Sequence, residues 1–216
     1  MVFLTIDDGL TRWPEFLAAM LAAHVPVTIF PTAQAVVAEP GFFLPMLAAG
    51  ATLGNHTVTH PLLTRIAPTR QQQEICAAAS VERQALGVAP FMFRPPYGAF
   101  GKATGAAAAA CGMSQELLWD ASVNDGVVVT YGGPVSQANP LLPGDIMLMH
   151  FRPSFLADFG AALAAAKLSN LRIAALTDYV RPTLASPDQQ ARQDAALAGF
   201  AAVRTAIRPP PQRSTP

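Results

Sequence analysis

The chain has 216 residues, enough for one domain with a sizeable core, with or without a tail. It is 51% hydrophobic and 13% charged, and its 14 Lys and Arg residues balance its 14 Asp and Glu residues. Phosphate binding requires clustered Lys and Arg, and no such cluster occurs, so the composition argues against nucleic acid as a partner.

Short apolar runs alternate with alanine-rich helical segments along most of the chain. The predicted strands are Val2–Ile6, Pro26–Phe30, Ala51–Gly54, Phe91–Phe93, Glu116–Trp119, Ile146–Met149 and Leu171–Ala174. The predicted helices are Trp13–Ala23, Phe42–Ala49, Arg70–Leu86, Lys102–Ala110 and Phe155–Lys167. This alternation with short connections indicates an α/β fold of parallel strands with helices outside them. The number of strands favours an irregular (β/α) barrel in a single domain.

The composition changes after residue 183. Residues 184–216 predict one weakly amphipathic helix followed by a Pro-rich end, whose last residues we expect to be disordered. The chain is therefore divided into a main domain, residues 1–183, and a C-terminal tail, residues 184–216.

The sequence shows neither a membrane span nor an export signal. No stretch reaches about 18 uninterrupted apolar residues, and Met1 leads directly into the first apolar run. We expect that a longer parent or a different start codon supplies an export segment. Cys76 and Cys111 fit neither a disulfide framework nor a thiolate zinc site, so they form either one bridge or two buried thiols.

Most of the chemically reactive side chains follow the C-terminal ends of predicted strands. They are Asp7 and Asp8 after the first strand, His56 and His60 after the third, Arg94 after the fourth, Asp125 beyond the fifth and His150 at the end of the sixth. Open α/β sheets and barrels gather their active sites at this edge. Polar residues scattered through a core would not share one end, so the pattern predicts a single site.

The two histidines and the paired carboxylates suggest a metal centre. His56 and His60 are four residues apart, which places both imidazoles on one face if the segment is helical, and two nitrogens suit Zn²⁺. A metal ion also explains adjacent carboxylates, because one aspartate would bind it while the other acts as a base. The structural alternative is that Asp7 caps the following helix and Asp8 is solvated in a turn at Gly9.

Four segments occur in a familiar order: "TIDDG", "GNHTVTHPLL", "FRPPYGAF" and "GDIMLMH". They resemble the ordered motifs of the polysaccharide deacetylase family, the NodB-homology enzymes of carbohydrate esterase family 4. The resemblance runs from Thr5 to His150 and, with the following strand and helix, covers most of the chain up to about Val180. It implies the distorted (β/α) barrel of that family and makes residues 1–183 its catalytic domain.

The resemblance implies a role for each matching position. Asp7 matches the catalytic base, and His150 matches the general acid. Asp8, His56 and His60 match the ligands of one divalent metal ion, usually zinc and sometimes cobalt or another ion.

Further positions match the residues around the reacting groups. Arg94 matches the arginine that pairs with the base. Tyr97 matches the residue whose backbone N–H helps to hold the oxyanion, and Leu148 matches the apolar wall around the acetyl methyl. Pro95, between Arg94 and Tyr97, is grouped with the substrate-binding residues.

One motif departs from the family pattern. Where the family often has Asp-x-x-Asp-Trp, this chain reads "SVNDG", so that Ser122 replaces the first aspartate and Gly126 the tryptophan. We expect Asp125 to lie near His150 and to keep its imidazole charged at neutral pH. The missing tryptophan removes an aromatic wall from the substrate groove, and Trp119 is expected to pack in its strand.

These roles imply a metal-dependent deacetylase acting on N-acetylated sugars of a peptidoglycan- or chitin-like glycan. O-acetyl groups of a xylan-type polymer and small amides or cyclic imides stay open as alternative substrates. An inactive carbohydrate-binding protein is the alternative of another class. We expect a monomer located outside the cell or in its envelope, although without an export signal the cytoplasm stays open.

Overall fold

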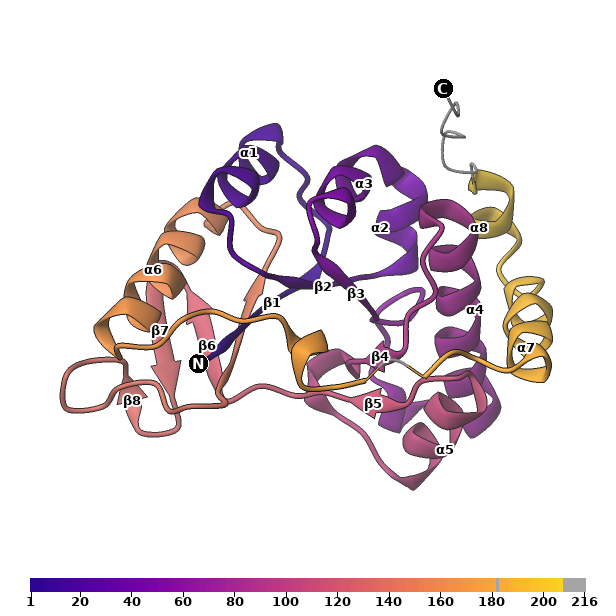
Figure 1. The fold of residues 1–216 in the computed structure, drawn as a ribbon. Helices are drawn as coiled ribbons and strands as arrows, with labels where there is room; N and C mark the ends of the chain where they lie inside the picture. Colours follow the sequence, from indigo (N-terminus) through magenta and orange to yellow (C-terminus); the bar gives the residue numbers. More distant parts are fainter. Residues whose placement is uncertain (182, 208–216) are drawn as a thin grey trace.

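The computed structural model describes residues 1–181 and 183–207, and its framework is a nine-stranded sheet (Figure 1). The strands are β1 (Phe3–Asp8), β2 (Thr28–Pro31), β3 (Thr52–Asn55), β4 (Met92–Phe93), β5 (Gln115–Glu116), β6 (Ala121–Asn124), β7 (Val127–Thr130), β8 (Gly133–Pro134) and β9 (Ile146–His150). Their order across the sheet is β5-β4-β3-β2-β1-β9-β6-β7-β8. Neighbouring strands are parallel except for the β6–β7 and β7–β8 pairs.

The predicted α/β fold is confirmed, but the sheet does not close into a complete barrel in the described part of the chain. The strand predicted over Glu116–Trp119 is shorter and begins one residue earlier. Leu171–Ala174 contributes only a single parallel bridge, between Ile173 and Val2. The β6–β7–β8 meander was not predicted.

Eight α-helices are described: α1 (Pro14–Ala23), α2 (Ala33–Ala38), α3 (Pro40–Ala48), α4 (Pro68–Leu86), α5 (Lys102–Ala110), α6 (Phe155–Leu168), α7 (Pro187–Leu197) and α8 (Ala201–Ala206). The five helices predicted before residue 183 are confirmed to within two residues at each end. Proline opens α1, α3, α4 and α7, where its missing N–H has no intrahelical partner to lose. None of the described helices has the length and apolarity needed to cross a membrane.

The central strand β1 is buried on both faces, as expected for a strand with parallel neighbours. Leu4 and Ile6 belong to the large core that also includes side chains of α1, α3 and α6. Phe3 belongs to a separate cluster on the other face. Because side chains alternate along a strand, Thr5 and Asp7 share the face of Phe3 and lead from this cluster to the C-terminal edge of the sheet.

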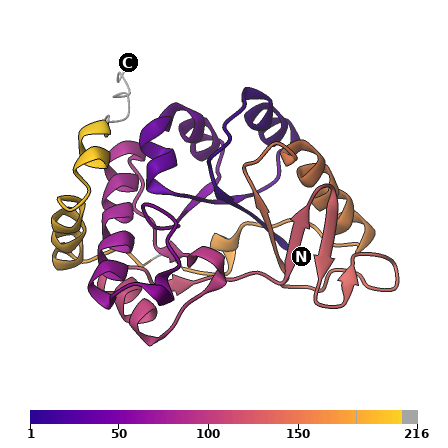
Figure 2. The same ribbon diagram turned by 180° about the vertical axis from the view of Figure 1, so that it is seen from behind.

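The C-terminal segment packs against the main domain. Helices α7 and α8 run along the outside of α4 (Figure 1), and Figure 2 shows the same arrangement from behind. Asp194 on α7 accepts hydrogen bonds from Ser80, Arg83 and Gln84 on α4. The predicted single tail helix is thus two helices, and the Pro-rich end at 208–216 lies outside the described residues.

The two cysteines form a disulfide, which decides between the two alternatives left open by the sequence. Cys76 lies on α4 and Cys111 directly follows α5, so the bond ties these two helices together. Gln193 of α7 donates a hydrogen bond of 2.8 Å to the Cys111 carbonyl, which links the C-terminal segment to the same corner.

Candidate active site

The strand register brings the reactive side chains to one edge of the sheet. Asp7 of β1 pairs with His150 of β9 on one side and with Phe30 of β2 on the other. Arg94 follows β4, and its backbone N–H bonds to the carbonyl of Asn55 at the end of β3. Direct contacts join five of the residues predicted at strand ends: Asp7, Asp8, His56, His60 and Arg94.

Asp7 and Arg94 form a buried ion pair. As a whole residue Asp7 is 2% exposed, and Arg94 is completely buried. Arg94 Nη1 donates to Asp7 Oδ1 at 2.8 Å and to Thr5 Oγ1 at 2.7 Å. Its Nε and Nη2 donate to the carbonyls of Leu117 and Leu118 at 3.1 and 3.0 Å. A buried pair is tolerated only when its donors and acceptors are satisfied in this way.

Asp8, His56 and His60 form a compact group of possible metal ligands. One oxygen or nitrogen atom from each lies within 4.8 Å of the others. Asp8 Oδ1 is 3.5 Å from His56 Nε2 and 3.3 Å from His60 Nε2. In the described part of the chain, this buried oxygen has no hydrogen-bond partner. The group therefore offers two imidazole nitrogens and one carboxylate, a set that suits a catalytic zinc-type ion.

The hydrogen bond on the far side of His56 fixes its tautomer. His56 Nδ1 lies 2.7 Å from the Arg94 carbonyl, which can only accept, so Nδ1 carries the proton. In the neutral imidazole Nε2 then keeps the lone pair, and this atom faces the carboxylates of Asp7 and Asp8. Orientation of a ligand histidine through its other nitrogen is the usual arrangement at protein metal sites.

The pKa shifts of Asp8 and His60 agree with a metal-binding role for these residues. Burial raises the pKa of Asp8, but the neighbouring imidazoles of His56, His60 and His150 lower it by more, so the net shift is downward. Burial and the nearby His56 lower the pKa of His60, which favours its neutral, ligating form.

Several non-glycine residues at the site have left-handed backbone conformations. The φ angle is 73° at Asp8, 67° at Thr57, 58° at His60 and 61° at Tyr97. Such residues cost of order 1–3 kcal/mol each and persist only where their surroundings hold them. At His60 the surroundings include Thr57 Oγ1, which accepts the His60 N–H at 3.1 Å. No feature of the sequence predicted these conformations.

The remaining predicted site residues surround the group. The exposed ring of Tyr97 packs edge-on against His60, with centroids 4.6 Å apart. Pro95 is buried at the start of the same turn. Leu148 is buried on β9 between Thr5 of β1 and Ser122 of β6.

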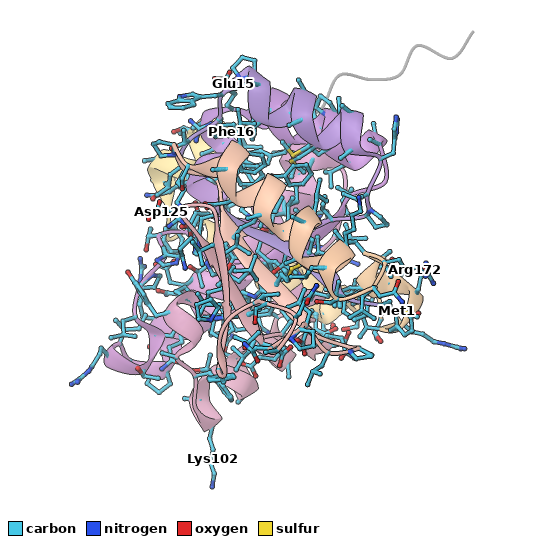
Figure 3. The ribbon with its side chains drawn as sticks, turned by 90° about the vertical axis from the view of Figure 1, so that its left-hand side faces the viewer. Met1, Glu15, Phe16, Lys102, Asp125 and Arg172 are labelled. Carbon is cyan, nitrogen blue, oxygen red and sulfur yellow. A yellow bond between two sulfur atoms is a disulfide. The ribbon has the colours of Figure 1, made fainter. Side chains whose placement is uncertain are left out.

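The expected contact between Asp125 and His150 is not formed in the described residues. It is exposed in the tight turn between β6 and β7, on the opposite side of the molecule from Met1 and Arg172 in Figure 3. Both Asp125 and Gly126 have positive φ, 49° and 78°, as a type I′ Asp-Gly hairpin turn requires. Across the described residues, no hydrogen bond or ion pair joins Asp125 to His150, and His150 Nδ1 is buried without a partner. The carboxylate is exposed because it lies in this hairpin turn. The sequence "NDG" before a β-branched run is typical of such a turn and could have predicted it.

Trp119 also differs from its expected place. It lies beyond the end of β5, and its ring centroid is 5.9 Å from the guanidinium carbon of Arg94. A Cβ atom added to Gly98 would come within 3.0 Å of the ring. Trp119 therefore packs against the Arg94–Gly98 segment instead of within a strand.

Glu74 on α4 contacts the histidine loop and was not among the predicted residues. It is 1% exposed, and its carboxylate accepts the backbone N–H groups of Val58 and Thr59 at 3.0 and 2.9 Å. A glutamate within a helical pattern gives no sign of a bond to a distant loop, so this contact could not be found from the sequence.

The family model for polysaccharide deacetylases matches residues 1–115 of the chain. A chitooligosaccharide deacetylase of Bradyrhizobium is 31% identical over 153 residues, which cover 69% of each chain. An uncharacterised protein of Streptomyces coelicolor is 35% identical over 147 residues, covering 68% of this chain and 58% of the relative. The solved structure of a family 4 carbohydrate esterase from Streptomyces lividans in complex with acetate aligns with a TM-score of 0.69 at 25% identity, over 85% of this chain and 96% of that one.

Proposed function

The chain belongs to the polysaccharide deacetylase family, and from that premise we propose that it removes acetyl groups from N-acetylated sugars of a chitin- or peptidoglycan-like glycan in a metal-dependent reaction. One arrangement carries the proposal: the buried Asp7–Arg94 pair lies directly beside the Asp8, His56 and His60 group.

The donor set fits one divalent ion, with zinc as the first choice and cobalt or another divalent ion as alternatives. Asp8, His56 and His60 would hold it, since Asp8 Oδ1 has no other partner in the described residues and His56 Nε2 is left free to ligate. Such an ion polarises an amide carbonyl and lowers the pKa of a bound water.

Asp7 is the proposed general base. Arg94 occupies its Oδ1, whereas Oδ2 lies 3.7 Å from His56 Nε2 and so faces the ligand group. The ion pair fixes the carboxylate in this orientation, and Oδ2 takes the proton of the attacking water.

The remaining roles concern the tetrahedral intermediate and the leaving group. The backbone N–H of Tyr97 stabilises the oxyanion, and His150 donates a proton to the departing amine, which is otherwise a poor leaving group. His150 lies in register with Asp7 on the neighbouring strand. Leu148, two residues earlier on the same face of β9, packs against the acetyl methyl.

We also propose that the protein acts outside the cytoplasm, as a monomer. The Cys76–Cys111 disulfide supports this location, because disulfides persist in oxidising compartments.

Acetate release tests the proposal. Chitin oligomers, peptidoglycan fragments and acetylated xylan are incubated with the metal-stripped protein, with and without added Zn²⁺ or Co²⁺, and Asp7→Asn serves as the control. We expect metal-dependent release from the N-acetylated substrates that the control abolishes. Release from xylan alone would indicate an O-acetyl esterase. No release from a folded, metal-loaded protein would favour a small amide substrate or an inactive binding protein.

A further inference from the structure

A glutamate on α4 lies behind the loop that carries both candidate metal-binding histidines. The Glu74 carboxylate accepts the N–H of Val58 and of Thr59 at Oε2 and the Thr59 hydroxyl at Oε1, the last at 2.8 Å. We propose that Glu74 is a positioning residue that sets the geometry of His56 and His60 and thereby the affinity of the site for its ion. This inference rests on the proposed metal site.

The loop depends on side chains for its conformation. From residue 57 to residue 60 each backbone N–H is bound by a side-chain oxygen: Asn55 holds the first, Glu74 the next two and Thr57 the last. Two of these four residues are left-handed, so the segment forms neither helix nor strand. Removing the carboxylate leaves two adjacent N–H groups unpaired, of which that of Val58 belongs to a fully buried residue.

The negative charge of Glu74 contributes to its proposed positioning role. Bonds from N–H groups to an ionised carboxylate are shorter and stronger than bonds to a neutral acceptor. Arg70, one turn earlier on α4, balances the charge with an ion pair of 3.0 Å from Nη2 to Oε1. Its guanidinium carbon lies 4.4 Å above the ring of Phe200, which joins α7 to α8. Phe200 thus packs against the arginine of this ion pair.

The affinity for Zn²⁺ itself tests the inference without any substrate. The dissociation constant is measured at fixed pH by competition with a chromophoric chelator. We expect Glu74→Ala to weaken Zn²⁺ binding by roughly tenfold or more, as loss of outer contacts does at other metal sites. Glu74→Gln keeps one oxygen for the two N–H groups and is expected to restore most of the affinity. In the metal-free protein, the amides of Val58 and Thr59 should exchange with solvent faster in the Ala variant.

Two control variants separate positioning from a general loss of stability. Glu82→Gln changes another buried carboxyl of α4, and Asp194→Ala removes three hydrogen bonds between α7 and α4. Both should leave the Zn²⁺ dissociation constant unchanged. If Glu74→Ala does not fold, Glu74→Asp replaces it, because a carboxylate withdrawn by one methylene lengthens the same bonds.

Unchanged Zn²⁺ affinity in a folded Glu74→Ala or Glu74→Asp protein overturns the inference. Equal weakening in Glu74→Ala and Asp194→Ala overturns it as well, because a general loss of stability would then explain both. A wild-type protein that binds no Zn²⁺ would instead overturn the proposed metal site, and this inference with it.

Discussion

Replacing Arg94 of the buried ion pair should lower the free energy of unfolding, and replacing Asp7 as well should reduce this loss. Arg94→Met leaves the Asp7 carboxylate, whose side chain is 3% exposed, without its cation. Breaking such a pair from one side costs about 3–5 kcal/mol, because a buried charge is left uncompensated. In the background of Asp7→Asn the buried cation of Arg94 is already without its counter-charge. Arg94→Met then leaves no unpaired charge behind and should cost about 2–3 kcal/mol less there.

The double-mutant cycle is measured by urea unfolding of the metal-free protein with EDTA present, so that no ion contributes to stability. For a chain of this size, 3–5 kcal/mol corresponds to roughly 6–20 °C in Tm. If Arg94→Met destabilises both backgrounds equally, the ion pair contributes no coupling. That result would refute the role of Arg94 in holding Asp7.

Three further outcomes follow from buried groups. Gly54→Ala should destabilise the protein by about 1–3 kcal/mol, because its Cβ would lie 2.1 Å from the fully buried ring of Phe30. Replacing Cys76 and Cys111 together by serine should cost about 3–4 kcal/mol, as expected for a disulfide spanning 35 residues. Burial raises the pKa of Glu82 well above 4.5. Above that pH the unfolded chain releases a proton that the native state keeps, so the free energy of unfolding falls by up to about 1.4 kcal/mol per pH unit. Glu82→Gln should remove this fall. At pH 7 the variant should therefore be more stable than the wild type.

Matched variants and treatments of the same protein serve as controls for these three predictions. A Cβ atom added to Gly41 of α3 would have no atom within 4 Å, so Gly41→Ala should stabilise the protein by about 0.5–1 kcal/mol where Gly54→Ala destabilises it. Thermal unfolding of both variants checks this contrast. Reduction of the wild type should reproduce the loss seen in the double serine variant. Parallel stability curves for wild type and Glu82→Gln between pH 5 and 7 would contradict the assignment of the pH dependence.

Much of the fold and the core of the site follow from local patterns in the sequence. Apolar runs of strand length and alanine-rich helical segments give the correct type of element almost everywhere before residue 115. In a sheet whose main strands are parallel, a polar residue at the end of an apolar run lies at a known edge. That rule placed Asp7, Asp8, His56, His60 and Arg94 in one region, where the structure joins them by contacts.

The features that the sequence did not predict depend on contacts between distant parts of the chain or on turn geometry. The Asp125–Gly126 pair was interpreted through a family motif, although its residue types also encode a hairpin turn, and the turn geometry prevailed. The docking of α7 on α4 and of α8 on α2 depends on complementary surfaces, which the periodicity within a single segment does not reveal. Glu74 lies 14 residues beyond His60 in sequence, and only the fold shows that its carboxylate bonds to the loop.

The backbone at Asp8 explains how adjacent aspartates come to share one site. Successive side chains of a regular strand point to opposite faces, so Asp7 and Asp8 should diverge. Yet both approach His56 Nε2, with Asp7 Oδ2 at 3.7 Å and Asp8 Oδ1 at 3.5 Å. The φ of 73° at Asp8 ends the regular strand geometry, and the Thr32 N–H bonds to the Asp8 carbonyl at 3.0 Å to hold the change. Arg94 neutralises Asp7, and the ion proposed for the Asp8, His56 and His60 group would neutralise Asp8, so that each carboxylate has a cation of its own and the repulsion between them is offset.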